Sequence, residues 1–255
     1  LAMDTSGDAQ RDVQTDPGDP RPDAQPDVPD DAPSDSAGED EDSGGQICED
    51  PEPDPFGQIA GMCGALSAAV LDGPSPYFFR NSIDFGTDPY DDEDFCRLTP
   101  GAREVITDEN AGGSSLLSEA LAFELLDRCD AAVLLKTETE VIYNDPMGKL
   151  TDLLVEVDGR KVGVSVTRAV GFPREDPYTV ERAQDLLERK LQGVLESTAN
   201  VAPEDAWTKQ VLYVIAYGPM HASSMEDAWA RIDETLRADT VVVVTVSDGA
   251  DEWIY

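Results

Sequence analysis

Asp152, Ser165 and Thr167 are the residues whose types and spacing most readily suggest chemistry. Asp152 opens one β-branched-rich run, and the other two lie near the end of the next run, in the string GVSVTR. The two runs flank Asp158-Gly159, a dipeptide typical of tight β-hairpins. A hairpin would place the Asp152 carboxylate at a strand end beside a polar pair on the next strand. That arrangement is suited to a metal-dependent site for phosphodiester hydrolysis.

The chemistry of phosphodiester hydrolysis points to further residues around this hairpin. A divalent metal polarises the phosphate and lowers the pKa of the attacking water, and Mg²⁺ prefers one or two carboxylates together with waters and substrate oxygens. Asp152 and Glu119, which lies on a helix predicted before the hairpin, are therefore the predicted ligands of Mg²⁺ or Mn²⁺. Arg168 and Lys190, the latter on a helix predicted after the hairpin, are predicted to stabilise phosphate charge.

Hydrophobic periodicity predicts an α/β domain that would position these residues. Ser114 or Ser115 is expected to cap the first helix, which carries Glu119, and Lys136 to bend or interrupt the first strand. Apolar runs late in the chain are typical of strands buried on both faces. The expected elements after the first helix are strand Ala131–Leu135 with Thr137–Tyr143, strands Asp152–Val157 and Lys161–Arg168, helix Tyr178–Ser197, strand Gln210–Ala216, helix Ser223–Leu236, strand Thr240–Val246, and a short edge strand at Trp253–Tyr255.

This order, a helix, a three-stranded meander, a helix, a strand, a helix and a strand, resembles the PD-(D/E)XK nuclease superfamily over about residues 114–246. The resemblance implies a restriction-endonuclease-like core and a nuclease that hydrolyses nucleic-acid phosphodiesters. Residue by residue, it assigns Asp152 as the metal-binding Asp and Glu119 as the helix carboxylate. The string TDLLVEVDGRKVGVSVTRA is similar, more narrowly, to an uncharacterised branch of the superfamily with such a VTR ending.

The chain departs from the family pattern on the third strand. The family carries a Glu and a Lys where this chain has Ser165 and Thr167, and neither hydroxyl can replace a carboxylate or a cation. Members of the superfamily can relocate the lost groups, especially to the following helix. The candidates here are Arg168 beside the pair, Glu181, Gln184 and Lys190 on the helix, and Glu156 on the same strand face as Asp152. The alternative is a catalytically degenerate domain of the same fold, acting as a binding or structural module tethered at the cell surface.

Charge and composition divide the chain into three regions. Residues 1–55 hold 18 acidic residues against 2 arginines and almost no large apolar residues, so we expect a disordered acidic linker. Residues 56–113 are expected to form a loop-rich extension packed on a core domain over 114–255. Beyond residue 55 there are 36 acidic residues and 16 basic ones. A field of that sign repels nucleic acid, the candidate partner, unless a local basic patch or a bound metal reverses it. Protein partners cannot be named from the sequence.

Cysteine content and the linker bear on location. Four cysteines without CxxC spacing permit two disulfides, with three possible connectivities, or reduced thiols (Cys48, Cys63, Cys96 and Cys129). The linker resembles the acidic Asp/Pro/Ala linkers of bacterial surface lipoproteins, which favours an extracytoplasmic or cell-surface setting. No apolar run is long enough to predict a membrane span. Because Leu1 is not an initiator Met, we expect a processed or trimmed product that lacks any signal peptide.

Three other features carry weaker functional hypotheses. The acidic stretch Asp88–Asp94 could collect calcium but lacks EF-hand spacing, so a solvated loop is expected. His221, the chain's one histidine, is expected at the surface, with no nucleophile elbow around it. The stretch Ala111–Ser115 could present backbone amides to an anion but lacks the Lys of a P-loop, and a hinge is expected. Tyr77-Phe78-Phe79 is interpreted as aromatic anchors within the loop-rich extension.

Overall fold

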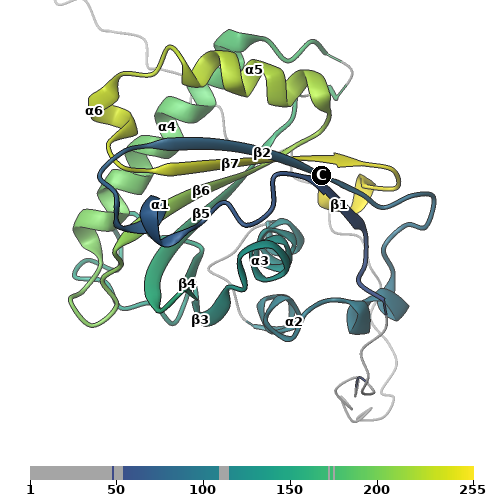
Figure 1. Cartoon of the computed structure of the whole chain (residues 1–255), viewed down its shortest axis with the longest axis horizontal. Helices are drawn as coiled ribbons and strands as arrows, with labels where there is room; N and C mark the ends of the chain where they lie inside the picture. The colour runs from purple at the N-terminus through teal and green to yellow at the C-terminus, as the bar shows by residue number, and fades with distance from the viewer. Residues whose placement is uncertain (1–47, 49–53, 109–114, 172, 175) are drawn as a thin grey trace, which may run out of the picture. The chain divides into compact units, whose positions relative to one another are not determined.

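The computed structural model describes residues 48, 54–108, 115–171, 173–174 and 176–255. The chain divides into two units, Leu1–Gln46 and Ile47–Tyr255, and all described residues belong to the second. The predicted disordered linker over residues 1–55 therefore falls almost entirely outside the described residues. The second unit is a seven-stranded mixed sheet with helices on both faces, as Figure 1 shows. The predicted α/β class is confirmed.

The sheet has the strand order β1-β2-β7-β6-β5-β4-β3. Its four inner strands β2, β7, β6 and β5 run parallel, and the remaining pairs at both edges are antiparallel. The strands are β1 (Gln58–Gly61), β2 (Tyr77–Asp84), β3 (Val133–Thr137), β4 (Leu153–Val157), β5 (Arg160–Ala169), β6 (Lys209–Ala216) and β7 (Val241–Asp248). Strand β6 is buried at every position because helices cover both of its faces, which is why it reads as a continuous apolar run.

Helices form one layer on each side of this sheet. Figure 1 shows α2 and α3 below it, and α4, α5 and α6 above it. Two apolar cores result, one between the sheet and α3, the other between the sheet and α4 with α5. The helices are α1 (Ala68–Asp72), α2 (Pro100–Thr107), α3 (Leu116–Asp130), α4 (Val180–Asn200), α5 (Pro219–Trp229) and α6 (Glu234–Arg237), with 3₁₀ turns η1 (Asp92–Arg97) and η2 (Glu252–Ile254).

The predicted hairpin at Asp158-Gly159 is confirmed. Both residues have positive φ, 50° and 74°, which is the conformation that a tight two-residue turn requires. The flanking residues Val157 and Arg160 pair directly across strands β4 and β5. The turn thereby fixes the register of the two strands next to the candidate site.

The first predicted strand is shorter than expected. It covers only Val133–Thr137, with an irregularity between Leu134 and Lys136 that agrees with the predicted bend. The extension to Tyr143 is wrong, because the chain turns after Thr137, whose backbone amide donates to the Glu140 side chain at 3.1 Å. An alternating pattern can thus belong to a turn, here one that buries Val141 and leaves Ile142 exposed.

Two predictions near the C-terminus are also wrong. The helix expected over Ser223–Leu236 begins instead at Pro219, since a proline needs no amide partner in the first helical turn, and it ends at Trp229. A separate short helix, α6, follows behind the cap supplied by Asp233. The edge strand expected at Trp253–Tyr255 is the 3₁₀ turn η2, with Ile254 buried.

The extension before the core domain contributes more structure than predicted. Tyr77-Phe78-Phe79 is not in a loop but opens β2, which pairs with β7 in parallel. The short helix α1 follows β1 and buries Val70 and Leu71. Residues 56–113 therefore complete the sheet instead of only packing against it.

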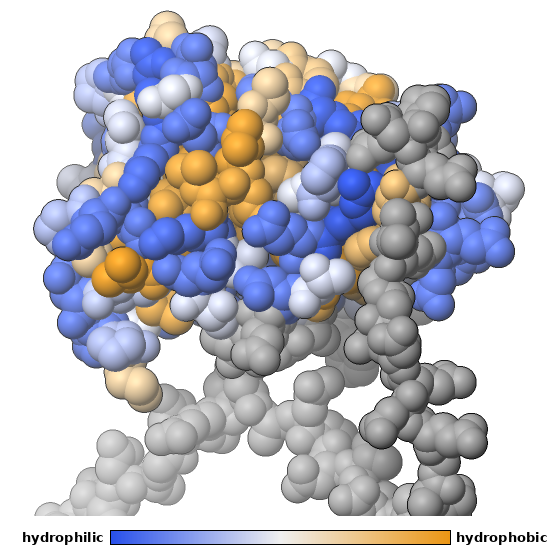
Figure 2. All heavy atoms as spheres, turned by 90° about the horizontal axis from the view of Figure 1, so that it is seen from below, coloured by the Kyte–Doolittle hydropathy of each residue, from blue (hydrophilic) through white to orange (hydrophobic). Residues whose placement is uncertain are grey.

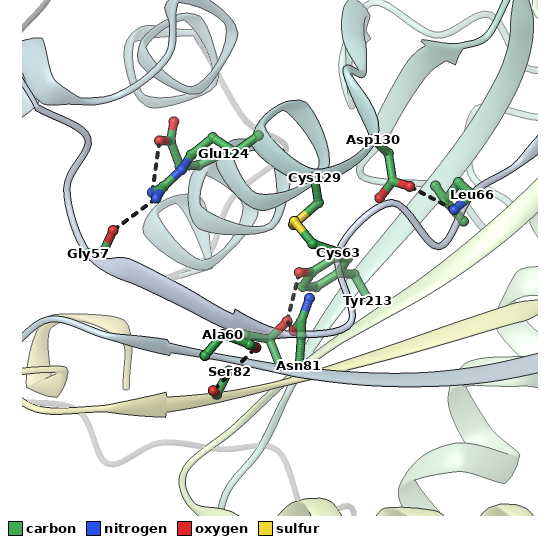
Figure 3. The surroundings of a disulfide bond; sticks show 12 residues. Gly57, Ala60, Cys63, Leu66, Asn81, Ser82, Glu124, Cys129, Asp130 and Tyr213 are labelled. Carbon is green, nitrogen blue, oxygen red and sulfur yellow. Dashed lines mark hydrogen bonds and ion pairs between the residues drawn. A yellow bond between two sulfur atoms is a disulfide. The ribbon is translucent and has the colours of Figure 1, made fainter.

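Two disulfides tie this extension down, Cys48–Cys96 and Cys63–Cys129. Figure 3 shows the second, which joins the segment after β1 to the C-terminal end of α3. Beside it, the Asp130 carboxylate accepts a hydrogen bond from the Leu66 amide at 2.7 Å. The C-terminal end of α3 is thus fixed to the extension by a covalent bond and by polar contacts.

An apolar patch is exposed among hydrophilic residues on the face that carries α2, α3 and β3 (Figure 2). On the edge strand β3, Val133 and Leu135 are 57 % and 38 % exposed. The strand is short and irregular, two features that discourage edge-to-edge pairing. None of the helices in the described part of the chain combines the length and the apolarity needed to cross a membrane.

Candidate functional site

Asp152 lies immediately before β4, opposite Ser165 on β5. Its backbone amide donates to the Val164 carbonyl at 3.0 Å, and its carboxylate Oδ2 accepts from the Val166 amide at 2.5 Å. The register that pairs Leu153 with Val164 places Asp152 and Ser165 on the same face of the sheet. The hairpin and these two hydrogen bonds hold the carboxylate at the head of the strand.

Glu119 lies in the first turn of α3 and is only 4 % exposed. Burial raises the pKa of its carboxyl, as does the charge of Glu138, whereas a hydrogen bond with the Ser115 side chain and the charges of Lys190 and Arg168 lower it. Its burial follows from the packing of α3 against the sheet.

Asp152 and Glu119 are electrostatic neighbours. Burial and the Glu119 charge together raise the pKa of Asp152 to about 7, although the Val166 amide and the Lys190 charge oppose this shift. Two carboxyls that resist ionisation together can be relieved by a shared proton or by a cation. The structure therefore brings together the two residues that the sequence predicted as metal ligands.

Lys190 and Arg168 approach the carboxylates from different elements. Lys190 on α4 is half-buried, and its Nζ donates to the Val166 carbonyl at 3.5 Å. Arg168 near the end of β5 is also half-buried, and its Nη1 donates to the Ile254 carbonyl at 2.8 Å. Lys190 lowers the pKa of both carboxyls and Arg168 that of Glu119, so their positive charges reach the pair.

A pocket of about 310 Å³ opens beside Asp152. It is lined by side chains from the loop before β4, from β5 and from α4. Gly193 on α4 also lines it, and a Cβ at that position would meet no atom within 4 Å. The lining residues are Glu138, Gly148, Lys149, Leu150, Asp152, Ser165, Arg189, Lys190 and Gly193.

Glu138 is a pocket residue that sequence reasoning missed. Its charge raises the pKa of both Asp152 and Glu119. The local string Thr-Glu-Thr-Glu after the first strand was the available signal, but it was interpreted as an alternating strand. Only the turn after Thr137 brings Glu138 to the carboxylate pair.

Ser165 and Thr167 differ in their surroundings. Ser165 is 8 % exposed and belongs to a buried polar cluster, with its hydroxyl 3.3 Å from the Thr151 hydroxyl. The Gln210 amide donates to the same cluster, at 3.5 Å to Ser165 and 3.2 Å to Ser197. Thr167 is half-buried on β5 and does not line the pocket. Ser165 therefore contributes to the pocket wall with its hydroxyl already engaged.

The other candidates for relocated groups lie outside the pocket. Glu156 is exposed on β4, as expected. Glu181 is exposed and contacts Arg231 at 3.4 Å, and Gln184 donates to Glu188 at 2.8 Å. Lys190 is the one candidate of the helix α4 set that lines the pocket.

The weaker hypotheses are explained by structural roles. His221 is 9 % exposed rather than on the surface, because its ring stacks on Tyr178 at 4.7 Å. In the acidic stretch Asp88–Asp94, Asp91 caps η1 and Asp94 binds Arg97 at 2.6 Å. The stretch Ala111–Ser115 lies outside the described residues except for its last residue.

The fit of a metal rests on the carboxylate pair. Among the residues that the structure describes, no group of three or more His, Cys, Asp or Glu side chains is placed to hold a metal ion. Asp152 and Glu119 supply two carboxylates, the number that Mg²⁺ commonly takes from protein alongside waters and substrate oxygens. Their reluctance to ionise together also fits a site completed by a cation.

Comparisons with known proteins give no functional description. The chain is 38 % identical over 153 residues to the AAC-rich mRNA clone AAC4 protein of Dictyostelium discoideum. That match covers 58 % of this chain and 22 % of the relative, so the chain spans about a fifth of the relative's length. No protein-family model matches the chain, and no solved structure matches it.

Proposed function

We propose that this domain is a divergent metal-dependent nuclease that hydrolyses nucleic-acid phosphodiesters at the pocket beside Asp152. The observation that carries the proposal is the electrostatic coupling of Asp152 with the buried Glu119, with Lys190 acting on both. Asp152 at the head of β4 and Glu119 on α3, whose charge acts on Asp152, would supply two carboxylates for Mg²⁺ or Mn²⁺, with Lys190 as a cation for a phosphate.

The arrangement of elements supports assignment to the PD-(D/E)XK superfamily. The succession α3, β3–β4–β5 meander, α4, β6, α5 and β7 matches the order expected for a restriction-endonuclease-like core. Strands β1 and β2 extend the sheet beyond that core, next to β7. Glu119 on α3 and Asp152 before β4 occupy the corresponding positions of the family's helix carboxylate and metal-binding Asp.

The residues would divide the work as follows. When bound, the metal would polarise the phosphate and lower the pKa of the attacking water. Asp152 and Glu119 would hold the metal through carboxylate oxygens. One oxygen of Asp152, Oδ2, also accepts a hydrogen bond from the Val166 amide. Lys190 lines the pocket and would neutralise charge that develops on the phosphate, in place of the family lysine that Thr167 replaces. Arg168 would add positive charge beside Glu119.

A second candidate function is a catalytically degenerate binding module, and the hydrogen bonding of the Ser165 hydroxyl favours it. That hydroxyl lies within the buried cluster with Thr151 and Gln210, so the position that carries the family's second carboxylate serves packing here. In that case the Asp152 carboxylate would act mainly as a hydrogen-bond acceptor that holds β4 against β5.

The two disulfides support a proposed extracytoplasmic or cell-surface location. Disulfides persist in oxidising compartments and are rare in reducing ones. Both pairs, Cys48–Cys96 and Cys63–Cys129, involve the extension that completes the sheet. The pair Cys63–Cys129 joins this extension to α3, the helix that carries Glu119, so oxidised cysteines help to hold one element of the candidate site.

The test is a titration of Mn²⁺ into the full chain, followed by incubation with single-stranded and double-stranded DNA and with RNA. Wild type is compared with Asp152→Asn and Glu119→Gln, which remove the carboxylates with little change of volume. Glu156→Gln is the matched control, because Glu156 is an exposed carboxylate on β4 outside the pocket. We expect wild type and the control to bind Mn²⁺ and cleave, and the two site variants to do neither.

Binding of Mn²⁺ without cleavage of any of the three substrates would favour the degenerate module. No uptake of Mn²⁺ by wild type, in a sample whose thermal melting shows it to be folded, would contradict the metal site itself. Cleavage that survives Asp152→Asn would place the chemistry elsewhere in the chain.

A further inference from the structure

A second pocket, of about 310 Å³, adjoins the candidate site and is lined by three arginines and one acidic residue. Arg189 lines both pockets. The second pocket is formed by the end of β5, the residues that follow it and the first half of α4. Its lining residues are Arg168, Val170, Gly171, Tyr178, Arg182, Asp185, Leu186 and Arg189.

Three guanidinium groups converge on this pocket from two elements. Arg168 comes from β5, whereas Arg182 and Arg189 are seven residues apart on α4 and so lie on one helix face. Burial raises the pKa of the Tyr178 hydroxyl to about 12 even though the charges of Arg189 and Arg182 act to lower it, so both arginines lie near that ring. A Cβ at Gly171 would lie 3.3 Å from Arg182 Nη1, so the glycine leaves room for this guanidinium.

These arginines are only partly neutralised by the protein. Arg182 has one distant carboxylate partner, Asp176, at 3.9 Å. Arg168 donates to a backbone carbonyl, and no carboxylate in the described part of the chain forms an ion pair with Arg189. Asp185 is the one acidic residue in the lining, so the pocket carries a net charge of +2 from three arginines and one aspartate.

That charge stands out in a chain whose formal net charge as a whole is −36. A chain so acidic repels polyanions over most of its surface, and a local cluster of arginines gives them one point of attachment. Guanidinium groups match phosphate oxygens in a two-pronged geometry and stay charged at every physiological pH. A phosphate monoester carries about −1.5 to −2 at neutral pH, close to the opposite of the pocket's charge.

We propose that Arg168, Arg182 and Arg189 bind a phosphate monoester, the phosphorylated end of a nucleic-acid strand that continues into the pocket of Asp152. This inference rests on the proposed nuclease function for the identity of the strand. The shared wall at Arg189 would place the strand end beside the carboxylate pair. The enzyme would then recognise its substrate from a phosphorylated end rather than by gripping the duplex along its length.

The test measures binding by the full chain in EDTA, where no metal-dependent cleavage occurs. Three fluorescent single-stranded oligonucleotides of one sequence carry a 5′-phosphate, a 3′-phosphate or hydroxyls at both ends. We expect one phosphorylated form to bind at least tenfold more tightly than the hydroxyl form. Arg182→Gln with Arg189→Gln should reduce that preference to less than threefold. Both side chains are exposed, so the double variant is expected to fold, and thermal melting is the check.

Lys161→Gln is the matched control, because it removes a positive charge near the opposite end of β5 and should leave the preference intact. Equal binding of the three oligonucleotides would overturn the proposal. So would a preference that survives the double arginine variant. Tighter binding of a phosphoserine peptide than of either phosphorylated oligonucleotide would assign the pocket to a protein partner and also overturn it.

The result is separable from the proposed function itself. Cleavage that depends on Mn²⁺ and Asp152, without any preference for a phosphorylated end, would leave the nuclease standing and remove the end-binding pocket. A phosphate preference that depends on the arginines, in a protein that cleaves nothing, would leave the pocket standing as a binding site and remove the nuclease.

Discussion

The Asp152 carboxylate accepts a hydrogen bond from the backbone amide of Val166 at 2.5 Å, which joins the head of β4 to the middle of β5. The bond occupies one carboxylate oxygen and fixes the rotation of the side chain. A metal ligand held in this way is preorganised for its partner. It also makes Asp152 part of the sheet, so stability and chemistry are coupled at this residue.

Stability should fall as the pH rises through the range in which Asp152 ionises in the folded state. Its pKa is about 7 when folded against an ordinary 3.8, so between these values the folded chain binds the additional proton. The contribution is full below about pH 4 and lost above about pH 7, on the order of 4 kcal/mol. Asp152→Asn should match wild type at pH 4 and unfold at higher urea concentration at pH 8. The same midpoints for both proteins at pH 8 would contradict the raised pKa.

Metal binding should release protons. At pH 6, below the folded pKa of about 7, Asp152 is mostly protonated, so Mn²⁺ must displace about one proton to bind it. Isothermal titration calorimetry in two buffers of different ionisation enthalpy measures that number. Glu156→Gln should behave as wild type, and heats that do not depend on the buffer would show that the metal binds away from Asp152.

Substitution of Lys190 should weaken catalysis without removing the carboxylates. Its charge lowers the pKa of both Asp152 and Glu119, so Lys190→Met should shift metal uptake to higher pH. Cleavage should fall on the order of 10²-fold if the ammonium stabilises phosphate charge. Lys161→Met, at the other end of β5, serves as control. Unchanged cleavage with a shifted uptake curve would restrict Lys190 to an electrostatic effect on the ligands.

Two substitutions of Gly193 test access to the pocket and stability of the fold separately. A glycine inside the 21-residue helix α4 costs about 1 kcal/mol relative to alanine, and its missing Cβ faces open space. Gly193→Ala should therefore raise the free energy of unfolding by about 1 kcal/mol. Gly193→Leu should keep the fold but fill the pocket, lowering cleavage at least tenfold. Full activity of the leucine variant would show that substrate does not enter beside α4.

The Cys63–Cys129 disulfide should support the position of α3. It closes a loop of 66 residues, for which chain-entropy estimates give about 4 kcal/mol. Cys63→Ser with Cys129→Ser should lower the free energy of unfolding, measured by urea denaturation, by that amount and weaken Mn²⁺ binding, because Glu119 lies on α3. The pair Cys48→Ser and Cys96→Ser is the control, since it joins Cys48, which precedes the extension, to η1 and touches no element of the site. Equal losses of Mn²⁺ affinity in both pairs would point to a general loss of stability.

Local sequence signals were sufficient where structure is set by neighbours in the chain. The hairpin at Asp158-Gly159, the apolar strand β6 and the long helix α4 each carry a pattern that depends on nearby residues alone. The same holds for the prediction that Asp152 stands at a strand end. These elements position one half of the candidate site.

The other half depends on contacts between distant segments. Strand β2 has no clear alternation, because its pairing with β1 and β7 decides its faces. Glu138 reaches the carboxylates through a turn that the alternating pattern disguised. In the sequence, Arg189 looks like any other exposed residue of a helix. Only the structure shows that it lines two pockets.

The parallel pairing of β2 with β7 has a consequence for how the chain folds during its synthesis. The buried hydrogen bond from the Thr245 hydroxyl to the Asn81 side chain at 2.5 Å spans 164 residues of chain. Strand β2 therefore has no inner neighbour until β7 has been synthesised, and its edge stays unpaired until then. The sheet can be completed only through this pairing of distant segments, which slows folding and exposes the chain to aggregation. A chain truncated before Val241 would keep the candidate carboxylates in its sequence and still lack the fold that brings them together.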